Sequence, residues 1–178
     1  EHIAINLDPK VNNLRRLLFI LRTRPSLKLI FERLKKRGQT KSVQQSIAEA
    51  FPGQTMKAQV HHIENHLAHL ASSYLCSPFK DAINVSIDGM GDFASAALGP
   101  GVNGKITIED RVYFPHSLGI FYSALTQWLG FPHYGDEYKV MGLAPYGQPN
   151  HMDQMRRIVH LRDDGSFRIN LDCFRHHK

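Results

Sequence analysis

Two neighbouring stretches of this 178-residue chain constrain its fold more than any other feature. Residues 61–69 hold four of the eleven histidines, and residues 82–92 form an apolar run that ends in an acidic, glycine-rich turn. Such a bounded apolar run predicts a β-strand. Imidazoles one helical turn apart share a helix face and can share a cation, which an aspartate at a strand end can also bind. The pattern therefore predicts a site built from one helix and one strand.

The chain before residue 56 is predicted to be helical and basic. Asp8-Pro9 is typical of a helix start, and apolar residues then recur at helical spacing until Pro25. A second helix is expected over residues 27–34, and the pattern from Ser42 to Gln45 resembles a capping box that opens a third.

We interpret residues 1–55 as a basic helical insertion. Eleven of the 22 Lys and Arg residues lie between Lys10 and Lys41, and a solvated helix face is the common meaning of such a run. The basic helices carry no interleaved aromatic residues for base stacking, so we do not expect a nucleic acid as partner.

Residues 56–178 are expected to alternate short strands and helices, which predicts an α/β fold with a mixed sheet. Ser117 is expected to cap a helix that Gly130 ends, with Trp128 and Leu129 among its core-facing residues. The other expected elements are an extended stretch from Met56 to His61, a helix over 65–75, a strand over 82–88, a hairpin of 93–98 and 105–113 joined by a six-residue loop over 99–104, an irregular segment over 135–147, a helix over 152–161 and a strand over 167–169.

Composition points to a cytoplasmic protein. The 42% hydrophobic content of the chain can form one ordinary core. Cys76 and Cys173 lie far apart and form neither a C-x-x-C motif nor a disulfide framework, which favours a reducing compartment. No apolar run approaches the roughly 20 residues of a membrane span, and no signal sequence opens the chain, so no membrane partner is expected.

Five collinear motifs resemble the O-carbamoyltransferases that modify nodulation factors and antibiotics. The resemblance is strong over residues 57–149. The motifs are Ile63-Glu64-Asn65-His66-Leu67-Ala68-His69, Ser77-Pro78-Phe79, Asp88-Gly89-Met90-Gly91-Asp92-Phe93-Ala94, Phe114-Pro115-His116-Ser117-Leu118-Gly119 and the segment from Gly135 to Gly147.

The resemblance implies both a fold and a reaction. Members have an actin/Hsp70/sugar-kinase-like (ribonuclease H-like) domain followed by a YrdC-like domain. They make carbamoyl-adenylate from ATP and carbamoyl phosphate, then transfer the carbamoyl group to a hydroxyl of a small-molecule acceptor. Because family proteins are longer, we expect residues 56–178 to be part of the actin-like domain. We expect the family's first strands and the YrdC-like domain to lie elsewhere in the protein, and this stretch alone to be inactive.

The metal ligands can be chosen in more than one way. Helical spacing allows His62 with His66, His66 with His69, or Asn65 with His69. The resemblance implies the last pair, but its first position is normally histidine, so Asn65 is a departure. Asn65 could coordinate through its amide oxygen, His66 or His62 could replace it, or the metal could bind poorly.

Asp88, at the end of the expected strand, is a further candidate metal ligand. The resemblance implies Fe²⁺, whereas the residue types alone also permit Zn²⁺ or Mn²⁺.

Two further groups of residues are candidates for nucleotide binding and catalysis. The turn residues Asp88, Gly89, Gly91 and Asp92, together with Glu137, are expected to bind the ATP-derived cofactor. Asp92 could equally orient the turn through local hydrogen bonds. Lys139 could contact phosphate or carbamoyl oxygens as a point charge, and His116 could act as an acid or base. For His116, an N-terminal capping role beside Ser117 is the alternative.

Two other functions remain open from the sequence. A tRNA threonylcarbamoyl transferase would share the fold and the histidine pair, although the motifs over 114–119 and 135–147 argue against it. A degenerate, non-catalytic binding fragment would account for Asn65. Nothing in the residues identifies the acceptor.

Overall fold

The computed structural model describes residues 1–24, 42–54 and 56–177, which form two compact units, 1–63 and 64–177. The helix expected over residues 27–34 lies outside the described residues. Among the described helices, none has both the length and the apolar character needed to cross a membrane.

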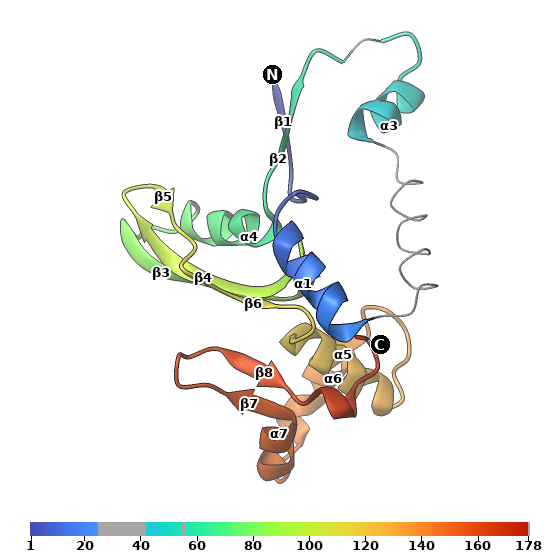
Figure 1. Cartoon of the computed structure of the whole chain (residues 1–178), viewed down its shortest axis with the longest axis vertical. Helices are drawn as coiled ribbons and strands as arrows, with labels where there is room; N and C mark the ends of the chain where they lie inside the picture. Colours follow the sequence, from blue (N-terminus) through green and yellow to red (C-terminus); the bar gives the residue numbers. More distant parts are fainter. Residues whose placement is uncertain (25–41, 55, 178) are drawn as a thin grey trace. The chain divides into compact units, whose positions relative to one another are not determined.

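The first unit contains a two-stranded parallel sheet and two helices (Figure 1). Strand β1 (His2–Ile5) pairs with β2 (Gln59–His62), and the helices are α1 (Asn13–Thr23) and α3 (Val43–Ala50). The region expected to be helical therefore begins with a strand.

The helix ends of this unit test the predicted caps. The expected start of the first helix at Asp8-Pro9 is wrong. Asn12 is the N-cap residue of α1, and Asp8 instead accepts a hydrogen bond from the Lys10 amide in a preceding turn. The capping box of α3 is confirmed, because Ser42 and Gln45 each accept a bond from the other's backbone N–H.

The second unit is built on an antiparallel sheet in which β4 pairs with β3, β5 and β6. A separate antiparallel pair, β7 with β8, follows near its end. In chain order, the elements of the second unit are α4 (Asn65–Tyr74), β3 (Asp81–Gly91), β4 (Ala94–Val102), β5 (Lys105–Ile106), β6 (Asp110–Tyr113), α5 (Leu118–Trp128), α6 (Glu137–Leu143), η1 (Ala144–Tyr146), α7 (Met152–Ile158), β7 (Val159–Leu161), β8 (Phe167–Ile169) and η2 (Leu171–Cys173). The α/β class is thus confirmed, while parallel and antiparallel pairings fall in separate sheets of the described chain.

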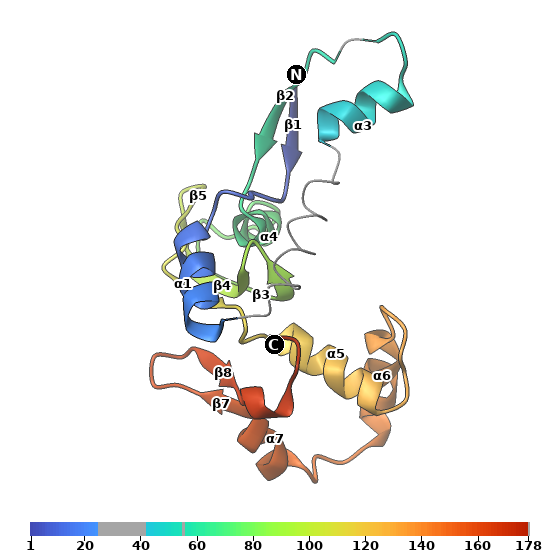
Figure 2. The ribbon, with the colours of Figure 1, turned by 45° about the vertical axis from the view of Figure 1, so that its right-hand side comes forward.

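Helix α4 packs along one side of this sheet, and α5 lies beyond the other side near the end of β3 (Figures 1 and 2). Three residues at four-residue intervals, His66, Leu70 and Tyr74, form the buried face of α4. The β3 residues that are buried are Asn84 and Ser86, both polar.

The apolar residues of β3 that alternate with these polar ones point away from α4. Ile83, Val85 and Ile87 are each more than half exposed in the described structure. The bounded apolar run predicted the strand correctly, but the face that α4 covers is the polar one.

The expected loop over residues 99–104 is mostly strand, so that prediction is wrong. β4 continues to Val102, and the turn consists of Asn103 and Gly104, both with positive φ (49° and 79°). The two other glycines serve close packing. A Cβ on Gly99 would lie 1.9 Å from the Thr107 carbonyl oxygen, and one on Gly101 would lie 2.8 Å from the Tyr74 ring.

Helix α5 begins as expected but is less buried than expected. Ser117 caps it by accepting a bond from the Ile120 amide, and Gly130 follows its end with φ +94°. However, Trp128 and Leu129 are 81% and 51% exposed, so they do not face a core within the described residues.

The last predicted helix is also shorter than expected. α7 ends at Ile158, and residues 159–161 form strand β7 instead, pairing with the predicted strand β8. Residues 159–161 form their backbone hydrogen bonds with β8, and the spacing of apolar residues in the sequence does not show this pairing.

The start of α5 is held unusually close to the end of β3. A Cβ on Gly119 would lie 2.5 Å from the Gly89 amide nitrogen and 2.8 Å from the Asp88 carbonyl carbon. The Ser117 hydroxyl, fully buried, donates to the Gly89 carbonyl at 2.6 Å. These contacts hold the start of α5 against the end of β3. They involve backbone atoms, which cannot rotate away as a side chain can.

We predict that Gly119→Ala lowers the free energy of unfolding by about 1–3 kcal/mol, because the methyl group would overlap rigid backbone. Gly142→Ala is the matched control, since nothing lies within 4 Å of a Cβ there and alanine favours the helix. Urea unfolding of both variants measures the difference. Equal stability of the two variants would contradict the close approach.

Candidate active site

His69 of α4 and Asp88 of β3 meet at the end of the sheet. His69 Nε2 lies 3.6 Å from Asp88 Oδ2, and both side chains are a little under half exposed. The second carboxylate oxygen of Asp88 accepts a 2.6 Å hydrogen bond from the Gly89 amide. The sequence predicted both residues as metal ligands, and the structure places them next to each other.

Asn65 is the first residue of α4, one turn before His69 and on the same helix face. Its side chain abuts the β3–β4 turn, where a Cβ on Gly91 would lie 2.0 Å from the Asn65 amide oxygen. Asp92, which is 4% exposed, accepts a hydrogen bond from the Asn65 backbone amide at 2.9 Å. Gly91 and Asp92 therefore pack the turn against the start of α4.

The structure settles which helical phase the histidines follow. α4 begins at Asn65, so His62 is off the helix, where its Nδ1 contacts the Leu7 carbonyl oxygen at 2.8 Å. His66 points into the interior with no exposed surface, and its Nδ1 lies 2.9 Å from the Ser86 hydroxyl. Its Nε2 is buried without a hydrogen-bond partner among the described residues. Because His62 lies outside α4, His62 and His66 do not share a helix face.

The described residues would supply only some of the ligands of a metal bound here. Catalytic metal sites commonly use three protein ligands. His69 and Asp88 give one nitrogen and one carboxylate donor, and the Asn65 amide lies on the same face of α4. Within the described ranges, no group of three His, Cys, Asp or Glu residues is arranged to hold a metal. One imidazole nitrogen and one carboxylate oxygen are donor types that suit a divalent metal, which would need further ligands.

An open cleft of about 540 Å³ adjoins this pair. Its described lining comes from the end of β3, the first half of α5 and the segment that leads into α6. Asp88 belongs both to this lining and to the pair with His69. The lining residues are Ile87, Asp88, Gly89, Leu118, Gly119, Ile120, Tyr122, Ser123, Tyr134, Gly135 and Glu137.

Glu137, the first residue of α6, is held in place by a hydrogen bond from α5. The Ser123 hydroxyl donates a 2.5 Å hydrogen bond to Glu137 Oε1. This bond, with weaker help from backbone amides, holds the pKa of the Glu137 carboxyl below its ordinary value. Glu137 therefore carries a full negative charge at neutral pH.

Lys139 is engaged with Asp136, the residue just before its own helix. Its ammonium donates a 2.7 Å hydrogen bond to Asp136, which is almost buried, and lies 5.8 Å from the centre of the Phe131 ring. The bond lowers the pKa of the Asp136 carboxyl and raises that of the Lys139 ammonium. Asp136 also accepts a bond from the His133 amide. Lys139 is not among the described residues that line the cleft.

His116 is also absent from the described lining of the cleft. Its half-buried ring lies against β8, where the Ile169 backbone accepts its hydrogen bond. Burial is the main cause that lowers the pKa of the His116 imidazole, and the positive charge of Arg168 lowers it further. The backbone carbonyl of His116 accepts a bond from the buried Ser95 hydroxyl.

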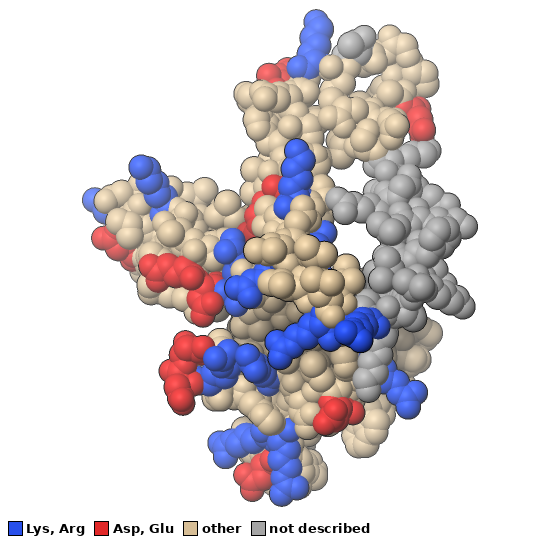
Figure 3. Space-filling model, in the orientation of Figure 1, with Lys and Arg blue, Asp and Glu red and all other residues tan. Residues whose placement is uncertain are grey.

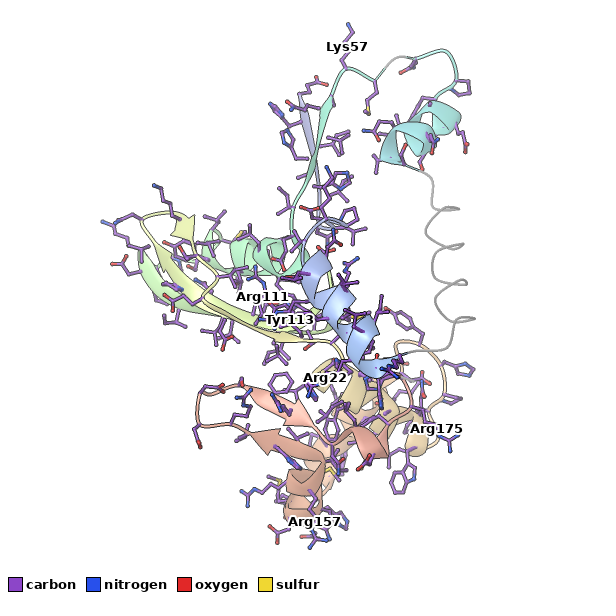
Figure 4. All side chains as sticks on the ribbon, viewed as in Figure 1. Arg22, Lys57, Arg111, Tyr113, Arg157 and Arg175 are labelled. Atoms are coloured by element: carbon purple, nitrogen blue, oxygen red, sulfur yellow. The ribbon has the colours of Figure 1, made fainter. Side chains whose placement is uncertain are left out.

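Three residues of this region were missed by the sequence reasoning. Ser123 and Tyr134 line the cleft, and no spacing or motif pairs Ser123 with Glu137. Glu64 is the third. Its Oε2 caps α4 by accepting a bond from the Leu67 amide. Its Oε1 lies 3.7 Å from Nε of Arg111, which extends from β6 toward α4 (Figure 4). A glutamate just before a helix was the available signal for this cap.

Opposite charges lie close together over α7 and the β7–β8 hairpin. On the face shown in Figure 3, Lys and Arg side chains there lie beside acidic ones. Arg156 is 3.7 Å from Asp153, and Arg162 is 3.4 Å from Asp164. Exposed pairs of this kind contribute little to stability, but they offset part of the basic charge of this region.

Comparison with known proteins identifies relatives over most of the chain. The family described as carbamoyltransferase N-terminus matches residues 28–178. The nodulation protein NolNO of Sinorhizobium fredii is 37% identical over 129 residues, which are 71% of this chain and 18% of NolNO. NolO of Bradyrhizobium diazoefficiens is 39% identical over 113 residues, or 62% of this chain and 20% of NolO. An uncharacterised Synechocystis protein is 42% identical over 112 residues, covering 62% of this chain and 18% of that protein. The chain thus spans about a fifth of the length of these relatives.

We predict that His66 stabilises the fold and is not a metal ligand. His66→Ala should lower the free energy of unfolding by about 2–4 kcal/mol, because it leaves a cavity between α4 and β3. Ser86→Ala should cost about 1–3 kcal/mol by removing the partner of the buried ring. Urea unfolding measures both losses. A metal titration of folded His66→Ala should match the unaltered protein, and abolished metal binding would show that His66 is a ligand.

Proposed function

Because this chain belongs to the carbamoyltransferase N-terminus family, we propose that it forms part of the transfer site of an ATP-dependent O-carbamoyltransferase. The substrates would be carbamoyl phosphate, ATP and a small molecule with a hydroxyl group. We propose that the second unit is part of an actin-like domain and that a YrdC-like domain elsewhere in the intact protein makes the carbamoyl-adenylate.

One observation carries this proposal: Asp88 both contacts His69 and lines the cleft. It lies 3.6 Å from His69 on one side and lines the 540 Å³ cleft on the other. A group that can bind a cation therefore borders a space large enough for a small-molecule substrate. This arrangement is suited to metal-assisted transfer.

His69 and Asp88 would hold a divalent cation, with the Asn65 amide as a weaker third donor. The family resemblance implies Fe²⁺. When bound, this cation would supply polarisation of carbamoyl or phosphate oxygens. The carboxylate of Asp88 has one oxygen turned toward His69 and the other fixed by the Gly89 amide, so its orientation is set before a ligand arrives.

In the proposed transfer, the acceptor oxygen forms a bond to the carbamoyl carbon of carbamoyl-adenylate. The bond from that carbon to the phosphate oxygen breaks, AMP leaves with the bonding electrons, and the proton of the acceptor hydroxyl passes to water. The cleft residues of this chain would orient the acceptor beside Asp88 and reduce its freedom, which is how proximity lowers such barriers.

Lys139 and His116 have different parts in this proposal from those the sequence suggested. Lys139 is a positioning residue, because its bond to Asp136 fixes the segment that carries Glu137 into the cleft. His116 packs against β8 and is given no step in the transfer.

The test is performed on the intact protein with His69→Ala and Asp88→Asn. Each variant should lose at least about tenfold in metal affinity, as loss of a ligand costs no less than loss of a supporting residue, and should lose carbamoyl transfer in parallel. Metal analysis and formation of carbamoylated product measure the two losses. Circular dichroism should show an unchanged fold.

His151→Ala is the matched control, because His151 is exposed at the start of α7, outside the described lining of the cleft. It should keep both metal and transfer. If His69→Ala and Asp88→Asn also kept both, the proposed site would be wrong.

A further inference from the structure

Two histidines from different strands meet in the first unit, outside the candidate active site. Strands β1 and β2 run side by side (Figures 1 and 2). His2 extends from β1 and His61 from β2, and His2 Nδ1 lies 2.8 Å from His61 Nε2. The ring centres are 4.9 Å apart, and the ring planes are tilted by 46°. Neither residue takes part in the proposed transfer.

The register of the two strands explains why these rings meet. Ala4 pairs with His61, and His2, two residues before Ala4, lies on the same face of the sheet because side chains alternate along a strand. His2 and His61 are therefore diagonal neighbours. The same alternation places His62 on the opposite face, where its Nδ1 contacts the Leu7 carbonyl oxygen.

The separation of the two nitrogens suits a shared metal ion. Zn–N bonds are about 2.0–2.1 Å long, so two nitrogens bound to one tetrahedral zinc lie about 3.3 Å apart. The rings would have to separate by only about 0.5 Å to reach this geometry, and His2 is free to adjust because it is exposed. In the hydrogen bond, one ring donates an N–H to the other. When that ring moves the proton to its outer nitrogen, both neutral rings present a lone pair to the metal.

A metal bound here would join two strands that have little else to hold them together. β1 and β2 form a two-stranded sheet in the described part of the first unit, and residues 6–58 separate them in the chain. A two-stranded pair is marginally stable by itself, and parallel pairing is slightly weaker than antiparallel pairing. A cation that binds both rings therefore stabilises the paired state of the strands.

We propose that His2 and His61 form a transition-metal site that fastens β1 to β2. Imidazole donors suit zinc, copper and nickel ions, and water would complete the coordination. Mn²⁺ is lowest in the affinity order of the divalent first-row metals and should not occupy this site. The pair lies within the first unit, whereas His69 and Asp88 lie in the second, so this inference does not depend on the proposed function.

The test is a calorimetric titration of the intact protein with Zn²⁺. His2→Gln and His61→Gln should each weaken the binding of one zinc equivalent by at least about tenfold, since loss of a ligand costs no less than loss of a residue that supports one. The double variant should lose this same equivalent and no second one, because both rings bind one ion. Unchanged zinc binding in the single variants, or the loss of two separate equivalents in the double variant, would overturn the proposal.

Two control variants show whether the effect belongs to this pair. His62→Gln alters the neighbouring histidine on the opposite face of the sheet and should keep the zinc equivalent. His69→Ala removes a ligand of the proposed catalytic cation and should keep it as well. If His62→Gln or His69→Ala removed the equivalent that His2→Gln removes, that zinc would be bound elsewhere and the proposal would be wrong.

Amide hydrogen exchange tests whether the metal fastens the strands. If zinc binds only when β1 and β2 are paired, a zinc concentration ten times the dissociation constant should slow exchange of their amides about tenfold. His2→Gln should show none of this slowing at the same zinc concentration. Zinc binding by the unaltered protein with unchanged exchange would mean that zinc binds separate side chains, which contradicts a site shared by the two strands.

Discussion

The close approach of α5 to the end of β3 is the contact on which the rest of the site depends. Gly119 lies so close to the backbone of Asp88 and Gly89 that no side chain fits between them. The buried Ser117 hydroxyl ties the same two elements together. On the other side of the sheet, His66 and Ser86 hold α4 against β3. Asp88 is therefore positioned by both helices, which brings it to His69 and to the cleft together.

The elements that the sequence predicted well are those whose ends are fixed by local chemistry. The caps of α3 and α5 are side chains that bond amides three residues away, so the pattern contains the whole interaction. The failures have tertiary causes. Glycines at 99 and 101 indicated a loop, but they serve close contacts with Thr107 and Tyr74, and nothing near them in the sequence distinguishes the two uses.

The candidate site could be predicted in part because its residues lie in short segments that are close in the sequence. Residues 65–69 and 88–92 are each short segments, and the packing of a helix on its neighbouring strand brought His69 to Asp88. His66 belongs to the buried face of α4, and the spacing of His66, Leu70 and Tyr74 was the available sign of that face. The bond between Ser123 and Glu137 joins two helices, so no local pattern could reveal it. Lys139 bonds Asp136, the N-cap residue of its own helix.

The most direct test of the account is to locate the metal itself. Crystals of the intact protein soaked in Mn²⁺, with diffraction measured at a wavelength where manganese scatters anomalously, would show its position independently of any activity. The account predicts a peak within coordination distance, about 2.0–2.3 Å, of His69 Nε2 and an Asp88 carboxylate oxygen. A metal bound by other residues, or a fully loaded protein with no peak at this pair, would contradict it.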